Sequence, residues 1–324
     1  MALVNDLVEL GGAGMAVTEF GRADAAPTAP GVVRVGVHRG GPAPDRGLDG
    51  FDILLSSSPN APRPWISTPA AADENLAVLA EAVKRQPVAA AVCAQVLRLT
   101  LRGSFEEALA LESLAYSMLL ASEGFAAWRA ATPARWRPHD DAPRVEIETG
   151  GDALVIRLNR PARRNAFDAR MRDELAEALR FALEHPDAPP VLLCGAGPAF
   201  SAGGDLDEFG RAGDVGLAHL IRTLRSPARL ARALGERLTA RLHGPCVGAG
   251  IEVPAAAARV TAAPGAVFRL PEVSMGLIPG AGGTATIARR IGRQRACWMA
   301  ISGADIDLAT ALAWGLVDAE APAP

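Results

Sequence analysis

The chain has 324 residues, of which 49% are hydrophobic, and a formal net charge of −3. This length and apolar content can bury a large core, as one large domain or two modest ones. A slightly acidic chain without a basic stripe and interleaved aromatic residues argues against a nucleic-acid-binding protein. It has no stretch of about 18 uncharged apolar residues, and its first ten residues lack a signal-peptide pattern. We therefore expect a cytoplasmic protein that binds neither nucleic acid nor membrane.

The cysteines are few and far apart, and all lie in apolar stretches. Their spacing matches neither a metal site nor a disulfide framework, so we expect buried thiols in a reducing compartment. No ligand cluster or dinucleotide fingerprint occurs, so the sequence predicts neither a metal nor a redox cofactor. The four cysteines are Cys93, Cys194, Cys246 and Cys297.

Residues 1–72 carry the weakest signals and form a first segment to which we assign no role. Apolar runs at 32–37 and 51–55 predict two strands, which a Gly/Pro-rich linker separates. A small strand pair that caps or extends the core is the expected structure.

Residues 73–130 are helical by pattern and belong to a second segment, the helical module 73–138. Asp73 is a fair N-cap, Pro87 can begin a second helix, and Ser104 with Glu107 makes a capping box for a third. The third helix carries a mixed polar and apolar face that could pack on a neighbour. Its members are Leu109, Glu112, Leu114, Ser117 and Leu120.

Residues 139–324 form a third segment, with strands alternating with helices. Alternation predicts a hairpin over 145–158, Asp168 caps a helix over 169–184, and 191–194 reads as a buried parallel strand. The loop at 195–204 follows the carboxyl end of that strand, where open α/β units bind ligands. Residues 207–235 are helical.

The stretch 243–284 contains two acidic residues, Glu252 and Glu272, in small or apolar surroundings. A strand over 238–242, a glycine turn and a helix over 251–260 would aim unpaired N–H groups at one point near Ala249. Taken alone, Glu252 could simply complement a helix dipole, and the Gly/Pro-rich turns could merely separate secondary-structure elements. We interpret the whole stretch as an active site.

Four motifs, in family order over about 175 residues, give this chain its resemblance to the crotonase family of enoyl-CoA hydratases and isomerases. They are LNRPARRNAFD, AFSAGGDL, HGPCVGAGIE and FRLPEVSMGLIPGAGGT. The resemblance implies an α/β fold, with a spiral of ββα units and a helical oligomerisation module. It also implies assembly as a homotrimer or hexamer.

The same resemblance implies roles for individual residues. Glu252 and Glu272 correspond to the acid/base pair, and the amides of Gly204 and Ala249 to an oxyanion hole. By its position alone, Asp205 is expected to cap a helix or to brace its loop and not to be catalytic. The residues implied in holding coenzyme A are Arg163, Arg164, Ala202 and Gly203. Those implied in holding the acyl group are Phe209, Leu217, Leu220, Ile221, Leu277 and Gly280.

The implied activity is the addition of water across the 2,3 double bond of an acyl-CoA, in fatty acid metabolism. Coenzyme A would enter as part of the substrate, and no separate cofactor is expected. Other enolate reactions stay open: double-bond isomerisation, dehalogenation and cofactor-free oxygenation. A non-catalytic CoA-binding subunit is the alternative from another class.

The chain departs from the family pattern in its order. Family members usually carry the helical module after the core, whereas residues 75–128 resemble that module and precede it. We predict a circular permutation in which these helices dock near residues 306–316; an unrelated N-terminal helical domain is the alternative.

Single positions depart from the family pattern as well. Ala249 stands where Gly is usual, and Pro254 and Ala258 would reshape the following helix. The basic pair expected at the phosphates is shifted to Arg129 and Arg135.

Overall fold

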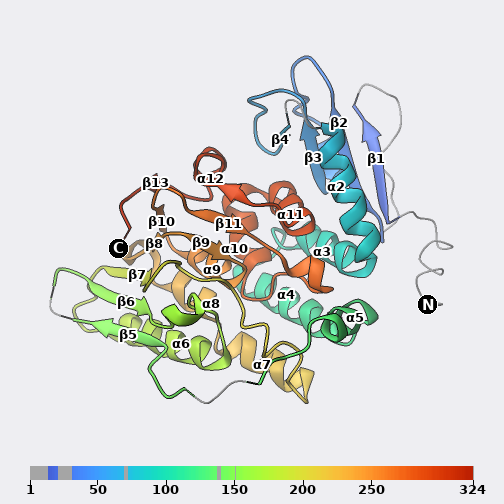
Figure 1. The fold of residues 1–324 in the computed structure, drawn as a ribbon. Helices are drawn as coiled ribbons and strands as arrows, with labels where there is room; N and C mark the ends of the chain where they lie inside the picture. The colour runs from blue at the N-terminus through green and yellow to red at the C-terminus, as the bar shows by residue number, and fades with distance from the viewer. Residues whose placement is uncertain (1–13, 21–30, 69–71, 137–139, 150, 324) are drawn as a thin grey trace.

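The computed structural model describes residues 14–20, 31–68, 72–136, 140–149 and 151–323 (Figure 1). The strands and helices of these residues combine in a mixed α/β architecture, with three sheets and helices packed around them. The division into segments 1–72, 73–138 and 139–324 stays a prediction.

The N-terminal strands form a four-stranded parallel sheet, larger than the strand pair that we expected. Its order is β1-β2-β3-β4. The side chains of β3 are all buried, and Arg293 and Arg295 from a later helix donate to the carbonyls of Phe51 and Trp65 at 2.9 and 3.0 Å. This sheet is therefore tied to the C-terminal half of the chain. The strands are β1 (Met15–Glu19), β2 (Val33–His38), β3 (Ile53–Ser56) and β4 (Ile66–Ser67), with the 3-10 helix η1 (Leu48–Gly50).

Four helices follow, and local sequence signals set most of their ends. The second begins at Pro87 because proline has no amide hydrogen to satisfy. The third begins after Ser104, where both hydrogen bonds of the predicted capping box with Glu107 are present. The first starts one residue before Asp73, which is therefore not its N-cap. The helices are α2 (Ala72–Arg85), α3 (Pro87–Leu99), α4 (Phe105–Leu119) and α5 (Glu123–Ala131).

The main packing partners of these helices are not residues 306–316, as we predicted. Helices α2 and α3 pack on α11, α4 packs on α7 and α10, and α5 packs on the 3-10 helix η5. The predicted docking position is therefore wrong, and the permutation is not supported in that form. The apolar faces of these helices are complemented by helices nearer the active-site stretch.

The core sheet has six strands in the order β13-β10-β8-β7-β6-β5. The predicted hairpin β5/β6 is antiparallel, and every other pair is parallel. Asp168 caps α6 by accepting from the Met171 amide at 2.7 Å, as predicted. The strands are β5 (Val145–Glu148), β6 (Leu154–Leu158), β7 (Val191–Gly195), β8 (Leu238–Leu242), β10 (Arg259–Ala262) and β13 (Ala319–Glu320).

A small sheet in the order β12-β11-β9 and the remaining helices complete the described fold. The strands are β9 (Pro245–Val247), β11 (Val267–Arg269) and β12 (Ile306–Asp307). The α-helices are α6 (Ala169–Glu184), α7 (Val215–Leu224), α8 (Pro227–Ala233), α10 (Gly283–Ile291), α11 (Arg293–Ser302) and α12 (Leu308–Trp314). The 3-10 helices are η2 (Pro161–Arg163), η3 (Gly235–Arg237) and η5 (Glu272–Met275).

Residues 251–260 do not form the single helix that we predicted. Helix α9 (Ala249–Glu252) ends after one turn, and the 3-10 helix η4 (Pro254–Ala256) follows it. Pro254 has no amide hydrogen to extend the helical ladder, and Ala257 is extended at φ −65° and ψ 148°. Glu252 therefore lies at the end of a very short helix.

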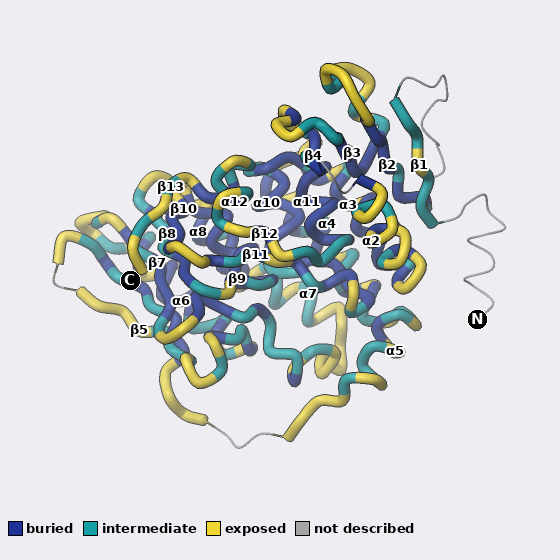
Figure 2. Tube along the Cα trace, turned by 45° about the horizontal axis from the view of Figure 1, so that its top comes forward, coloured by how far each residue is buried: buried dark blue, intermediate teal, exposed yellow. Residues whose placement is uncertain are grey.

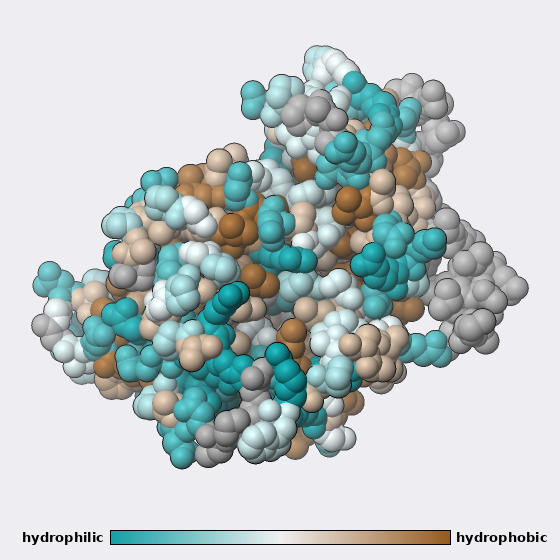
Figure 3. All heavy atoms as spheres, viewed as in Figure 1, coloured by the Kyte–Doolittle hydropathy of each residue, from teal (hydrophilic) through white to brown (hydrophobic). Residues whose placement is uncertain are grey.

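The buried parts of the chain follow the sheets and the inner helix faces (Figure 2). All four cysteines are free and buried, as predicted. Hydrophilic and hydrophobic residues are interspersed over the face shown in Figure 3. In the described parts of the chain, no helix has both the length and the apolar composition needed to cross a membrane.

Candidate active site

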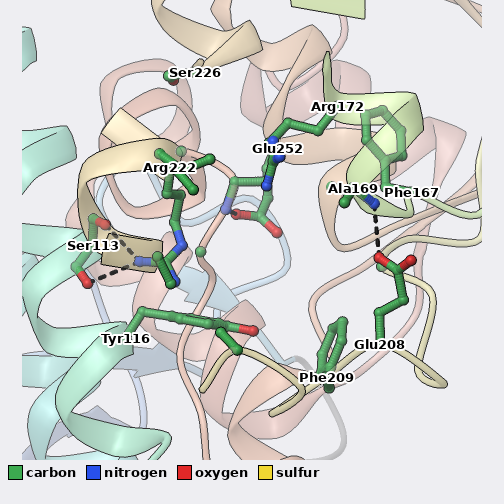
Figure 4. Close-up of a pocket in the computed structure, with 18 of the residues that line it drawn as sticks. Ser113, Tyr116, Phe167, Ala169, Arg172, Glu208, Phe209, Arg222, Ser226 and Glu252 are labelled. Carbon is green, nitrogen blue, oxygen red and sulfur yellow. Dashed lines mark hydrogen bonds between the residues drawn. The ribbon is translucent and has the colours of Figure 1, made fainter. Parts of the chain in front are cut away.

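A cavity of about 530 Å³ lies where α4, α7, α9 and the loop after β7 meet. Its lining includes Gly204, Ala249, Glu252 and Glu272, four positions separated by up to 68 residues in sequence. Figure 4 shows side chains from α4 and α7 on one side of Glu252, and Phe209 and Glu208 on the other. The fold therefore brings both predicted carboxylates and both predicted amides to one cavity.

The backbone at Gly204 is held by its neighbours, while its own amide is left without a partner. Gly204 forms an isolated parallel bridge with Phe167, in which the Phe167 amide donates to Gly203 and the Asp205 amide donates to Phe167, each at 2.8 Å. The Gly204 amide itself has no acceptor in the described chain. It is therefore available to a ligand oxygen.

Ala249 offers the second amide. It is the first residue of α9, so its N–H has no partner within the helix, and no other described acceptor receives it. Gly248 precedes it at φ 51° and ψ −123°, a backbone conformation that residues with a Cβ rarely adopt. The turn that aims the Ala249 amide therefore depends on glycine.

Glu252 is 2% exposed and is held by the turn before α10. Its Oε2 accepts from the amides of Ala281 at 2.7 Å and Gly283 at 2.9 Å. Burial raises the pKa of Glu252 to about 7, although these amides favour the ionised form and oppose the rise. Glu252 can therefore exchange a proton near neutral pH.

Glu272 begins η5 and faces the same turn as Glu252. A Cβ on Gly248 would collide with Glu272 Oε1 and lie 3.8 Å from Glu252 Oε1, so the two carboxylates meet over this glycine. Oε2 of Glu272 is buried without a hydrogen-bond partner in the described chain. Burial, and then the neighbouring Glu252, raise the pKa of Glu272 well above its usual value. The carboxyl group therefore favours its protonated form, and one of its oxygens has no partner in the described chain.

Glu112 on α4 is a third buried carboxyl group in the cavity, and we did not predict its role. It accepts from the amides of Gly282 and Thr284, each at 2.7 Å, and from the Thr284 hydroxyl at 2.7 Å. Glu252 and Glu112 thus alternate as acceptors along consecutive amides at residues 281–284. Burial, followed by Glu252, raises the pKa of Glu112 to about 8.

The sequence contained only a weak signal for Glu112, namely its place on the mixed face of the third predicted helix. That face is partly as expected: Glu112 and Ser117 are buried, but Leu114 is 56% exposed. Glu112 lies far from the family motifs in sequence. Nothing near it in the sequence indicated that its carboxylate oxygens would accept from amides at the start of α10.

Tyr116 and Arg222 also line the cavity and were not predicted. The guanidinium carbon of Arg222 lies 4.7 Å from the centre of the Tyr116 ring. Burial raises the pKa of the Tyr116 hydroxyl, so it stays neutral. A Cβ on Gly280 would overlap the Tyr116 ring, so the cavity wall requires glycine at this position.

The residues predicted to hold the acyl group divide into two sets. Phe209, Ile221 and Gly280 line the cavity. Leu277 does not: it is fully buried in the core, so its assignment to the substrate site is wrong. Leu217 and Leu220 are each 54% exposed on α7 and lie outside the cavity lining.

The residues predicted to hold coenzyme A lie in two neighbouring loops outside the cavity lining. Arg163 ends η2, Arg164 follows it, and the Ala202 amide donates to the Arg164 carbonyl at 2.8 Å. The Gly203 carbonyl accepts a hydrogen bond from the Phe167 amide. These loops adjoin Gly204, and their contact with coenzyme A stays a prediction.

Three further charged residues serve the loop at 205–207. Arg160 donates to Asp205 at 2.7 Å, so Asp205 braces the loop as expected. Arg129 donates to the Leu206 carbonyl at 2.7 Å, and Arg135 donates to Asp207. In this structure the two shifted arginines therefore support the loop.

Comparison with known proteins adds independent evidence to this geometry. The model of the enoyl-CoA hydratase/isomerase family matches residues 148–323, more than half of the chain. The chain belongs to the enoyl-CoA hydratase/isomerase family. The predicted membership of the crotonase superfamily is therefore confirmed.

Two curated relatives illustrate this family. The mevalonyl-coenzyme A hydratase SIDH of Beauveria bassiana is 34% identical over 51% of this chain and 62% of the relative. The 2,3-dehydroadipyl-CoA hydratase of Escherichia coli K12 is 35% identical over 51% of this chain and 64% of the relative. The chain thus spans slightly less than two thirds of each.

Solved structures of the family agree with the core. An enoyl-CoA hydratase from Thermoplasma volcanium superposes with a TM-score of 0.50 at 33% identity, over 56% of this chain and 72% of that one. Another from Geobacillus kaustophilus gives a TM-score of 0.51 at 27% identity, over 55% and 69%. The predicted α/β class with a crotonase-like core is confirmed.

Proposed function

We propose that this protein is an enoyl-CoA hydratase, which adds water across the 2,3 double bond of an acyl-CoA thioester. The observation that carries the proposal is the convergence of Glu252 and Glu272 over Gly248. This pair lies in a cavity that two unpaired amides, those of Gly204 and Ala249, also line. Family membership supports it, and coenzyme A is then part of the substrate, with no separate cofactor.

The amides act on the thioester carbonyl. When the water oxygen bonds to Cβ, the electrons of the double bond move toward the carbonyl, whose oxygen gains negative charge. The amides of Gly204 and Ala249 donate to that oxygen and are already oriented before the reaction begins. Loss of one such donor typically costs about 100-fold or more in rate.

The carboxyl groups divide the proton transfers. Glu252, whose ionised form is favoured by the Ala281 and Gly283 amides, takes a proton from the attacking water. Glu272, which favours its protonated form, gives a proton to Cα as the enolate collapses. The net change is one water added, and each carboxyl group is restored by exchange with solvent.

The test of this function follows the ultraviolet absorbance of conjugated 2-enoyl-CoA esters, from crotonyl-CoA to longer and aromatic chains. Hydration removes the conjugation, so the absorbance is expected to fall, and mass spectrometry should show addition of one water. A product of unchanged mass with a displaced double bond would favour isomerisation. Binding of the esters without reaction would contradict a catalytic role on them.

The rate should depend on pH through both glutamates. We expect kcat/KM to rise with pH through about 7, because Glu252 must lose its proton to act as base. It should fall again at higher pH, as Glu272 loses the proton that it donates. Initial rates with one enoyl-CoA, measured from about pH 5 to about pH 10, should show this bell shape. A flat profile would contradict these assignments.

The assembly and setting of the enzyme are part of the proposal. We infer a homotrimer or hexamer in the cytoplasm, acting in fatty acid metabolism, by analogy with the family. Light scattering of the purified chain should give three or six times the mass of one chain; a monomer would contradict this.

A further inference from the structure

Arg222 on α7 is a cation in the wall of the cavity, and its protein contacts occupy one end of its guanidinium group. Its Nη1 donates to the Ser113 hydroxyl at 2.6 Å, the Ser113 carbonyl at 3.2 Å and the Ser117 hydroxyl at 3.1 Å. Figure 4 shows the guanidinium above the Tyr116 ring, with dashed lines to Ser113. These contacts fix the position of the group.

No carboxylate pairs with Arg222 among the described residues. The charge of Glu112 acts on Arg222, but the two oxygens of Glu112 accept from Gly282 and Thr284. Of the other two arginines that line the cavity, Arg172 is paired with Asp173 at 2.7 Å and Arg211 is exposed. Because a partly buried charge is costly without a partner, an anion in the cavity would be stabilised at Arg222.

The remaining donors of Arg222 are free to meet a ligand. All its hydrogen bonds to described residues start from Nη1, so Nε and Nη2 have no protein acceptor. Neither nitrogen is among the fully buried unpaired atoms, so both retain access to the cavity. Two neighbouring N–H groups of a guanidinium match the two oxygens of a carboxylate.

The position of Arg222 identifies which end of a substrate would meet it. The loops proposed to hold coenzyme A adjoin Phe167 and Gly204, on the side of the cavity with Phe209. Figure 4 shows Arg222 and Tyr116 on the opposite side of Glu252. A thioester placed at the amides of Gly204 and Ala249 would thus extend its acyl chain toward Arg222.

We propose that Arg222 binds a carboxylate at the far end of the acyl chain, so that the preferred substrates are CoA thioesters of dicarboxylic acids. The inference rests on the proposed function for the CoA thioester, and adds to it the chemical nature of the acyl end. Ser113 and Ser117 position the guanidinium, and Tyr116 supports its face. Ile221 and Leu109 also line the cavity and supply apolar surface for the methylene groups.

The test uses two saturated esters that cannot be hydrated, adipyl-CoA and hexanoyl-CoA, which have the same chain length and differ in the terminal carboxylate. Calorimetry with the full chain is expected to show adipyl-CoA binding about 10- to 100-fold more tightly, as for a charge-assisted pair. Arg222→Met should remove this preference, and Arg222→Lys should retain part of it. Arg225→Met is the control, because Arg225 lies at the end of the same helix and pairs with Asp173 outside the cavity.

Results with the wild-type chain or with Arg222→Met can each overturn the proposal. Equal affinity for the two esters, or tighter binding of hexanoyl-CoA, contradicts it, as does a preference that survives Arg222→Met. If adipyl-CoA binds with the expected preference but the matching unsaturated ester is not hydrated, the carboxylate site stands and the hydratase function fails. If neither ester binds, the carboxylate site fails, and the ultraviolet assay decides the hydratase function separately.

Discussion

Glu252→Gln and Glu272→Gln are each expected to lower kcat/KM for hydration by about 10³-fold, within the range typical of lost general acid or base catalysis. Glutamine has nearly the same shape, but it can neither take the proton of water nor donate one to Cα. The ultraviolet assay on a single enoyl-CoA, with wild type and both variants side by side, measures this loss.

Two controls separate lost chemistry from lost structure. Glu184→Gln, on the exposed end of α6, should retain wild-type activity. A saturated acyl-CoA should bind both active-site variants within about threefold of wild type, because hydrogen bonds to a thioester oxygen come from the backbone. A loss of less than tenfold in either variant would remove that glutamate from the mechanism.

Glu112→Ala is expected to lower the free energy of unfolding by about 3–5 kcal/mol, because buried amides left without an acceptor cost roughly 1–3 kcal/mol each. The variant leaves the Gly282 and Thr284 amides without their acceptor at the start of α10. Since the Ala281 and Gly283 amides of the same turn hold Glu252, hydration should also slow. Urea unfolding followed by circular dichroism measures the first effect, and the ultraviolet assay measures the second.

The matched control for Glu112 is Glu106→Ala, an exposed glutamate on the same helix. It should change the free energy of unfolding by less than about 0.5 kcal/mol, as is usual for surface positions. The free energy of unfolding of Glu112→Gln should lie between those of Glu112→Ala and wild type, since the amide oxygen of glutamine can still accept one or two of the hydrogen bonds. If the free energy of unfolding of Glu112→Ala lies within about 1 kcal/mol of the wild-type value, as for mild variants, the turn at residues 281–284 does not depend on Glu112.

The helical module contributes to the cavity through its helix α4. Its helices precede the core in sequence, yet α4 contributes Glu112, Ser113 and Tyr116 to the cavity. The predicted docking near residues 306–316 is wrong, but a role for the module in the catalytic cavity emerges from its contacts with α7 and α10. The module is therefore part of the candidate active site.

The sequence by itself determined the features that depend on neighbouring residues. The capping box at Ser104 and the cap at Asp168 are satisfied within three residues, so their signals are local and both are present in the structure. The Gly248 turn and the position of Glu252 behind it were likewise readable from a short motif. The failure of the helix over 251–260 was also local, because Pro254 stood in the predicted helix.

Only the tertiary structure decided which distant groups meet. Glu112 accepts from residues 170 and 172 positions away, and Arg222 donates to residues more than 100 positions before it. No periodicity or spacing in the sequence encodes such pairs, because they depend on how whole helices pack. The four-stranded N-terminal sheet and the burial of Leu277 depend on packing in the same way. The motifs thus located the chemistry, whereas the packing of α4 and α7 shaped the cavity in which an acyl chain would lie.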